Sequence, residues 1–289
     1  MSIESKLKYF VWAATRLGAD RSCPACQSRR TTLIKRKYLV TSLYLCQDCR
    51  LLFRVPKCSP ADNDNFYQQD YSQGFTTECP NPNELEELKR TSFRGMEKDY
   101  SPYIAILRAL GLQAGCSLFE FGSSWGYGSW QLRQAGFRVY SCEISQPRAR
   151  YAAENLGCEM CTPEQLPEKV DCFLSAHVIE HLTSPRILWD AAEKALKSTG
   201  ILVVLTPNGE SAMADVYKIK ADKVRTREIH RAWGQRHPLL LTAEAFRLIA
   251  ADYGFTGCAY SSPYDLQQIA RGEQGRLEGS ELLLIARRG

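Results

Sequence analysis

The sequence predicts an α/β fold, in which a doubly wound, seven-stranded, mostly parallel sheet follows a small metal-binding module. After Gly115, short apolar strands alternate with helices, which is the pattern of a sheet covered by helices on both faces. A glycine-bearing turn at residues 122–126 joins one of these strands to a helix. Near the amino terminus, two Cys-x2-Cys pairs have the spacing of a four-thiolate metal site.

Length and charge restrict the class of protein. The chain has 289 residues and a formal charge of +5, enough length for one large domain or two unequal ones. This charge permits attraction to anionic small molecules but is too weak for a dedicated nucleic-acid binder. No apolar run approaches the roughly 20 residues that span a bilayer, and residues 9–14 are too short for a secretory signal. We therefore expect a cytoplasmic protein without a transmembrane segment.

The first part of the chain, residues 1–20, is expected to be an amphipathic helix. Its apolar side chains recur at helical spacing: Leu7, Phe10, Val11, Ala14 and Leu17. Such a helix docks on its own protein, or it binds a membrane surface or a partner. The sequence leaves these alternatives open.

Residues 21–58 are expected to form a zinc ribbon. Its ligands are Cys23, Cys26, Cys46 and Cys49, two pairs separated by nineteen residues. The intervening residues 31–44 are rich in β-branched and aromatic side chains that suit a hairpin. Four thiolates leave no open coordination position, so the zinc is expected to be structural. The alternative is four thiols without a metal.

Residues 59–112 are expected to form a linker and a helical cap. The segment is polar and turn-rich, but Phe66, Tyr67, Tyr71 and Phe75 interrupt it. We expect these aromatic groups to pack against the following domain or to cover its cleft. Residues 84–112 have a helical pattern with a break near Pro102.

Residues 113–289 are expected to form the α/β domain. Thr242 is expected to cap a helix that Gly254 ends, and no helix is expected between the last two strands. The seven expected strands are residues 116–121, 138–143, 158–161, 170–176, 200–206, 255–263 and 281–287.

The turn after the first of these strands has the character of a ligand site. The strand runs through Glu120 into Gly122, and Gly126 precedes a helix whose free N–H groups face the turn. Glu143 ends the second strand, 21 residues after Gly122, where a carboxylate accepts hydrogen bonds from ribose hydroxyls. The Gly-x-Gly-x-x-Gly spacing of dinucleotide sites is absent, which disfavours nicotinamide and flavin cofactors. An ordinary turn without a ligand is the alternative.

Two segments carry a resemblance to a known family. Residues 120–126, Glu-Phe-Gly-Ser-Ser-Trp-Gly, resemble the first motif of class I S-adenosylmethionine-dependent methyltransferases, with Ser124 at the middle glycine. Residues 170–182 resemble the strand and helix start that carry a Val-Leu-Glu-His-like sequence in many members. The resemblance covers roughly residues 85–289 and implies a Rossmann-like sheet with an antiparallel closing strand.

The resemblance also implies a cofactor, S-adenosyl-L-methionine, and its contacts. The expected contacts for the methionine portion of the cofactor are Glu120, Gly122, Ser123 and Gly126. Those for the nucleoside are Glu143 on the ribose, Ile144 on one adenine face, and Cys161 and Thr162 at the adenine edge. Ala176 and His177 are expected to face the sulfonium.

Two histidines are candidate catalytic bases. His181 lies near the end of the second segment, where Glu180 either orients it or caps the helix. His237 begins a stretch that resembles the family's substrate-side histidine. A purely structural role for the Glu180–His181 pair is the alternative. The preceding insertion is expected to be a substrate lid or an exposed helix, and it carries Tyr217, Arg225, Arg227, His230, Arg231 and Trp233.

These observations predict a methyltransferase that acts on a small-molecule acceptor, and the basic segments leave an anionic acceptor open. A zinc ribbon before this fold resembles sugar C-methyltransferases and related enzymes, which implies a nucleotide-linked sugar or a glycan or natural-product precursor. One alternative is an RNA methyltransferase that docks RNA through the ribbon, although the weak net charge disfavours nucleic acid. Another is a non-catalytic zinc-ribbon interaction protein.

Overall fold

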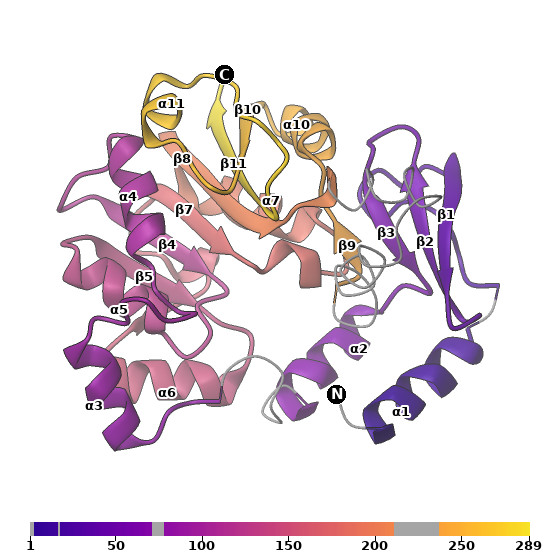
Figure 1. The fold of residues 1–289 in the computed structure, drawn as a ribbon, viewed down its shortest axis with the longest axis horizontal. Coiled ribbons are helices and arrows are strands. Elements are labelled where there is room, and N and C mark those ends of the chain that lie inside the picture. The colour runs from indigo at the N-terminus through magenta and orange to yellow at the C-terminus, as the bar shows by residue number, and fades with distance from the viewer. Residues whose placement is uncertain (1–2, 17, 71–77, 211–236) are drawn as a thin grey trace.

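A seven-stranded sheet forms the centre of the computed structural model, which describes residues 3–16, 18–70, 78–210 and 237–289. Its strand order is β10-β11-β8-β7-β4-β5-β6 (Figure 1). Only β11 runs antiparallel to its neighbours, so the mostly parallel sheet is confirmed. The strands are β4 (Ser117–Phe121), β5 (Arg138–Cys142), β6 (Glu159–Met160), β7 (Val170–Ala176), β8 (Leu196–Pro207), β10 (Phe255–Ser261) and β11 (Glu281–Arg288).

Both faces of this sheet are covered, as the apolar central strands require. Successive side chains on a strand point to opposite faces, so Leu118 and Phe119 belong to different core clusters. Helices α4, α5 and α11 contribute to the cluster of Leu118, and α7 and α10 to that of Phe119. The helices of this part are α4 (Ser101–Ala109), α5 (Tyr127–Gln134), α6 (Gln146–Leu156), α7 (Arg186–Ala195), α10 (Ala243–Asp252) and α11 (Leu266–Arg271), with short 3-10 turns η2 (Pro163–Gln165) and η3 (Ile179–His181).

The helix ends follow the capping chemistry of the sequence. Thr242 caps α10, since its hydroxyl accepts a hydrogen bond from the Ala245 N–H at 3.0 Å. The absence of a helix between the last two strands was a wrong prediction. There Asp265 accepts from two backbone N–H groups, and Gly272 ends α11 in the left-handed conformation, so cap and stop signals enclose this short helix.

A second sheet joins the amino-terminal module to the α/β domain. It has the order β1-β2-β3-β9, with β1 (Thr31–Lys37), β2 (Thr41–Cys46) and β3 (Leu52–Val55) from the module. Strands β1 and β2 are the expected hairpin. The fourth strand, β9 (Leu239–Leu240), comes from the α/β domain and pairs antiparallel with β3. The module therefore shares a sheet with residues that follow His237.

The module also packs on the helices at one face of the large sheet. Leu51 and Phe53 belong to the same core cluster as Trp189 of α7 and Phe246 of α10. Ser184, just before α7, donates a hydrogen bond to the Pro24 carbonyl at 2.7 Å. In Figure 1 the module lies beside β9 and α10. The burial of these side chains makes the module part of the main core.

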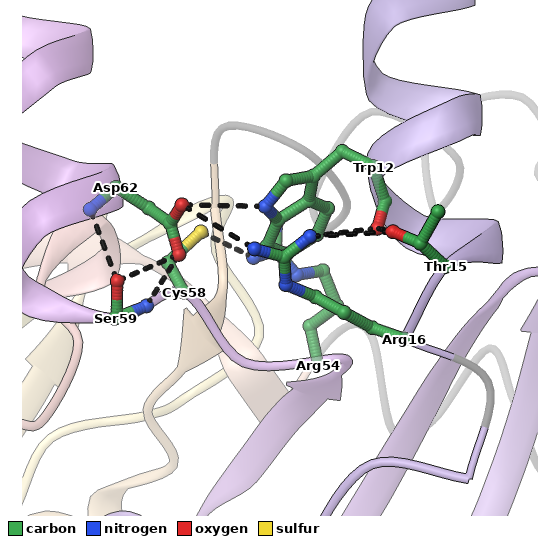
Figure 2. A network of polar contacts seen from close by, with 7 residues as sticks. All are labelled: Trp12, Thr15, Arg16, Arg54, Cys58, Ser59 and Asp62. Atoms are coloured by element: carbon green, nitrogen blue, oxygen red, sulfur yellow. Dashed lines mark hydrogen bonds and ion pairs between the residues drawn. The ribbon is translucent and has the colours of Figure 1, made fainter.

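The amino-terminal helix α1 (Ile3–Ala14) is fixed to β3 and to α2 (Pro60–Asn65). The indole N–H of Trp12 donates to Asp62 at 3.4 Å, and the buried Arg54 guanidinium lies 5.4 Å from the Trp12 ring centre (Figure 2). Arg54 also contacts the Cys58 sulfur at 2.8 Å. This face of α1 therefore contacts β3 and α2 through the Trp12 ring and the Arg54 cation.

The apolar stripe of α1 does not make that contact. Leu7, Phe10 and Val11 are 61%, 45% and 54% exposed, whereas Ala13 is fully buried. The helix docks through the neighbouring face because Arg54 draws the rings of Tyr9 and Trp12 toward β3. Among the described helices, none combines the length and apolarity that a membrane crossing needs.

The segment between the module and the large sheet packs against that sheet's domain. It contains the π-helical turn η1 (Phe66–Asp70) and α3 (Pro82–Arg90). The helical pattern of residues 84–112 was expected to break near Pro102. The interruption instead begins at Thr91, and α4 starts at Ser101. Phe93 has φ +58° and is fully buried beside Trp125 and Trp130, so burial of this ring breaks the helix.

Candidate functional site

The glycine-bearing turn lies between β4 and α5 and adopts left-handed backbone at three positions. Gly122 and Gly126 have φ +85° and +88°, which glycine adopts without a steric cost. Ser124 has φ +51°, a conformation that costs an L-residue about 1 kcal/mol or more. Its N–H donates to Glu143 Oε2 at 2.8 Å, and its hydroxyl accepts from the buried Arg148 at 2.7 Å. These two bonds hold serine in the geometry where the family motif has glycine.

The carboxylate of Glu143 is fixed at the end of β5. Besides the Ser124 N–H, it accepts a hydrogen bond from the Ser145 N–H at 2.8 Å. Burial raises the pKa of Glu143, although these backbone N–H groups and Arg148 oppose the rise. Each carboxylate oxygen keeps a further acceptor site for a hydroxyl. The ribose contact of Glu143 stays a prediction, and the geometry is suited to it.

Glu120, near the end of β4, is buried beneath the turn and contacts the start of α5. Its side chain is 1% exposed and accepts a hydrogen bond from the Ser129 hydroxyl at the start of α5. Burial raises its pKa. The neighbouring Gly128 has no room for a side chain, because an added Cβ would lie 2.3 Å from Glu120 Oε1. Glu120 thus organises the helix start, and its direct cofactor contact stays a prediction.

The expected adenine contacts lie along the same edge of the sheet. Ile144 is 48% exposed directly after β5. Gln68 of η1 donates to the Ile144 carbonyl at 2.8 Å, so the linker reaches this edge. Cys161 is half-buried and donates its N–H to the Ser141 carbonyl at 2.9 Å, and Thr162 precedes η2. Their contacts with adenine stay a prediction.

A charged group follows the end of β7. The imidazole of His177 contacts Glu281 at 2.6 Å and Glu180 at 3.4 Å. Burial disfavours its protonation, but the two carboxylates outweigh burial and raise the pKa of His177 to about 10. Glu281 was not among the site residues expected from the sequence. The antiparallel β11 begins at the carboxyl edge of the parallel strands, which was the available signal.

The fold brings the two candidate bases together. The ring centres of His181, in η3, and His237, before β9, lie 4.7 Å apart. Glu180 joins them, with ligand atoms of all three residues within 4.8 Å of one another. Burial would raise the pKa of Glu180, but the contact with His177, together with the charges of His181 and His237, outweighs burial and lowers the pKa to about 2. Glu180 is therefore a buried carboxylate with a lowered pKa beside the two imidazoles.

The cysteine pairs also converge, as predicted. The Cys23–Cys49 and Cys26–Cys46 sulfur distances are 3.4 and 3.5 Å, and all four sulfurs lie within 4.8 Å of one another. Four sulfurs bound tetrahedrally to one zinc ion lie about 3.8 Å apart. The donor set and spacing therefore fit a closed structural zinc site. The sharp knuckles show N–H···S contacts from Ala25 to Cys23 and from Cys49 to Cys46.

The predicted lid falls outside the described residues. Residues 211–236 include all of its anion-binding and aromatic candidates, and so the lid and exposed-helix alternatives stay as they were. Tyr71 and Phe75 of the linker also lie outside the described residues.

Part of the chain is similar to known proteins. Residues 119–204 match the family model described as "Methyltransferase domain". The plantazolicin methyltransferase BpumL, solved with a desmethyl analogue and S-adenosylhomocysteine, is similar at 12% identity and a TM-score of 0.50, over 78% of this chain and 96% of that chain. Magnesium protoporphyrin IX methyltransferase from Synechocystis PCC 6803 is similar at 17% identity and a TM-score of 0.48, over 78% and 98% of the two chains. No curated protein matches by sequence.

Proposed function

We propose that this chain, a class I S-adenosylmethionine-dependent methyltransferase with a four-cysteine site for structural zinc, methylates a hydroxyl group of a small molecule. A nucleotide-linked sugar or a glycan or natural-product precursor is the favoured acceptor. One observation carries the proposal: Val178 contacts both the turn at residues 122–126 and His181, whose N–H donates a hydrogen bond to the Val178 carbonyl at 2.9 Å. The side chain of Val178 lies so close to Gly122 that an added Cβ would be 2.3 Å from it.

Methyl transfer depends mainly on the alignment of the acceptor with the methyl group and the sulfur. S-adenosylmethionine supplies a methyl group that its sulfonium has already activated. The protein must hold the acceptor in line with that group, and positioning of this kind contributes most of the rate. Glu143 and the turn at residues 122–126 would fix the cofactor, because their geometry is set by backbone hydrogen bonds in advance.

The His181–His237 pair would activate the acceptor hydroxyl, as a proton acceptor or as ligands to a cation. General bases typically contribute about 10² to 10⁴ in rate. Both imidazoles are half-buried, so they remain within reach of a ligand. Glu180 would orient them, because its buried carboxylate lies within 4.8 Å of a ring nitrogen of each.

Charge and local contacts favour a small acceptor over a polymer. Gln68 of η1 contacts the Ile144 carbonyl beside the expected adenine position. The pairing of β9 with β3 ties the segment after His237 to the zinc module. RNA would need a broad cationic surface, and the formal charge of +5 over 289 residues is modest for that purpose.

The test is methyl transfer from labelled S-adenosylmethionine to a panel of nucleoside-diphosphate sugars, sugar phosphates and total RNA. Mass spectrometry would identify the methylated product. We expect label in a small molecule, and we expect Glu143→Ala to abolish it while the exposed control Glu159→Ala does not. Label in RNA alone would replace this proposal with the RNA alternative. Absence of S-adenosylhomocysteine binding would revive the non-catalytic alternative.

A further inference from the structure

We infer that Glu180, His181 and His237 bind one divalent transition-metal cation beside the cofactor turn. Each residue offers one ligand atom, and the three atoms lie within 4.8 Å of one another. Two of the ligands come from η3, while the third comes from the segment before β9, 56 residues further along the chain. The fold therefore assembles a two-histidine, one-carboxylate group that no local motif contains.

The distances suit one shared ion. Ligand nitrogens and oxygens bind such cations at about 2.1 Å, which places ligand atoms of one ion about 3 to 4 Å apart. Small rotations of the half-buried imidazoles would bring the three atoms from their present spacing to this one. The rings already meet edge to face, with their centres 4.7 Å apart and an interplanar angle of 74°.

The surroundings of Glu180 resemble those of a metal ligand. Its side chain is 1% exposed, and its Oε2 accepts a hydrogen bond from the hydroxyl of the buried Thr206 at 3.1 Å. His177 lies 3.4 Å from Oε1 and is itself held by Glu281. Such outer partners orient metal-binding carboxylates, and each oxygen keeps a further lone pair for the ion.

The three ligand residues indicate which cations the site would bind and which acceptor could join them on the ion. Two imidazoles and one carboxylate suit manganese, iron, cobalt or zinc, whereas the four cysteines form a softer set for zinc. Three protein ligands leave coordination positions open, in contrast to the closed cysteine site. An acceptor with two adjacent oxygen atoms would fill these positions. Binding to the cation would lower the pKa of an acceptor hydroxyl, so that its proton passes more easily to solvent water.

The location makes this ion part of the transfer site. Val178, two residues before Glu180, packs on Gly122 of the cofactor turn. The identity of the acceptor rests on the proposed function, but the binding of the metal does not. The two histidines then act as ligands instead of bases, because a nitrogen lone pair that binds an ion cannot accept a proton.

Manganese(II) is the probe for this site, because it favours nitrogen and oxygen ligands and leaves zinc on the four thiolates. Electron paramagnetic resonance would follow the loss of the free-ion signal on titration into the zinc-loaded full-length protein. We expect one bound manganese per chain. Glu180→Gln and His237→Gln should each weaken binding at least tenfold. The surface control Glu244→Gln, a carboxylate in an exposed pair with Arg50, should bind as the parent does.

Thermal unfolding of each variant would show whether it is folded. If the buried Glu180→Gln does not fold, His237→Gln alone tests manganese binding. No manganese bound by the parent protein, or equal binding by parent and His237→Gln, would overturn the inference. Calorimetry with S-adenosylhomocysteine separates this failure from failure of the proposed function. A protein that binds the cofactor product but not manganese is a methyltransferase that uses His181 and His237 in another way.

Discussion

The backbone N–H of Arg54 donates a hydrogen bond to the carbonyl oxygen of Pro238 at 2.8 Å. Arg54 belongs to β3 of the cysteine module, and Pro238 directly follows His237. The next residues continue the contact, since Phe53 pairs with Leu239 and Leu52 with Leu240. The metal-binding module therefore fixes the backbone on which one of the two site histidines stands.

Loss of the structural zinc is predicted to weaken both the fold and the site. Cys46→Ser should lower the free energy of unfolding by at least about 3 kcal/mol, because a closed zinc site contributes folding energy. Its kcat/KM should fall as well, since β3 holds the segment of His237. Denaturant unfolding and rate measurements test this, with the exposed Cys79→Ser as a control that should match the parent. Equal stability of Cys46→Ser and Cys79→Ser would contradict a structural zinc.

Ser124 is predicted to tolerate glycine but not a β-branched residue. Glycine removes the cost of the left-handed backbone but also the hydroxyl bond to Arg148, so cofactor-product affinity should change less than threefold. Ser124→Val should weaken it at least tenfold, because valine at φ +51° is strongly strained. Calorimetry with S-adenosylhomocysteine compares the two variants. An unchanged affinity in Ser124→Val would show that the turn is free to rearrange.

The carboxylate of Asp171 gives an acid-dependent prediction. It accepts bonds from Ser117 N–H and hydroxyl at 2.8 and 2.9 Å and from Lys197 at 2.7 Å. Burial acts to raise its pKa, but these partners outweigh burial and lower the pKa. A depressed folded-state pKa stabilises the fold above the unfolded value of about 3.9, and this stability is lost as the pH falls below it. Asp171→Asn should therefore cost about 1 kcal/mol at pH 7.

That cost should shrink toward pH 3, and denaturant unfolding at several pH values would follow it. The exposed Glu159→Gln should show no comparable dependence. A constant difference between parent and Asp171→Asn from pH 7 to pH 3 would contradict the role of the ionised carboxylate.

Helix α1 is predicted to be held by Trp12 and not by its apolar stripe. Trp12→Ala should lower stability by about 1 to 3 kcal/mol and expose α1 to proteolysis, because the ring covers Arg54 and bonds Asp62. Phe10→Ala, an aromatic change on the exposed face, should have little effect. Equal resistance of α1 to proteolysis in Trp12→Ala and Phe10→Ala would contradict the role of Trp12 in holding the helix.

Periodicity and spacing predicted most of the architecture. The seven strands, the hairpin of the module and the cysteine cluster follow from local patterns, because alternation, β-branched residues and Cys-x2-Cys spacing each specify local geometry. Contacts between distant segments were not accessible in the same way. No local pattern indicates that β9 pairs with β3, that Arg54 selects the face of α1, or that Glu281 holds His177. The sequence indicated His181 and His237 as separate candidates. Only the fold shows that both lie close to Glu180.

Binding of S-adenosylhomocysteine by Glu143→Ala is the most direct test of the central claim, that the turn after β4 and the carboxylate after β5 form the methyl-donor site. Isothermal titration calorimetry should show one molecule bound per parent chain. Glu143→Ala should lose at least tenfold in affinity, about 1.4 kcal/mol, while Glu159→Ala binds as the parent does. Equal affinity of Glu143→Ala and the parent, or no binding by the parent, would contradict the claim.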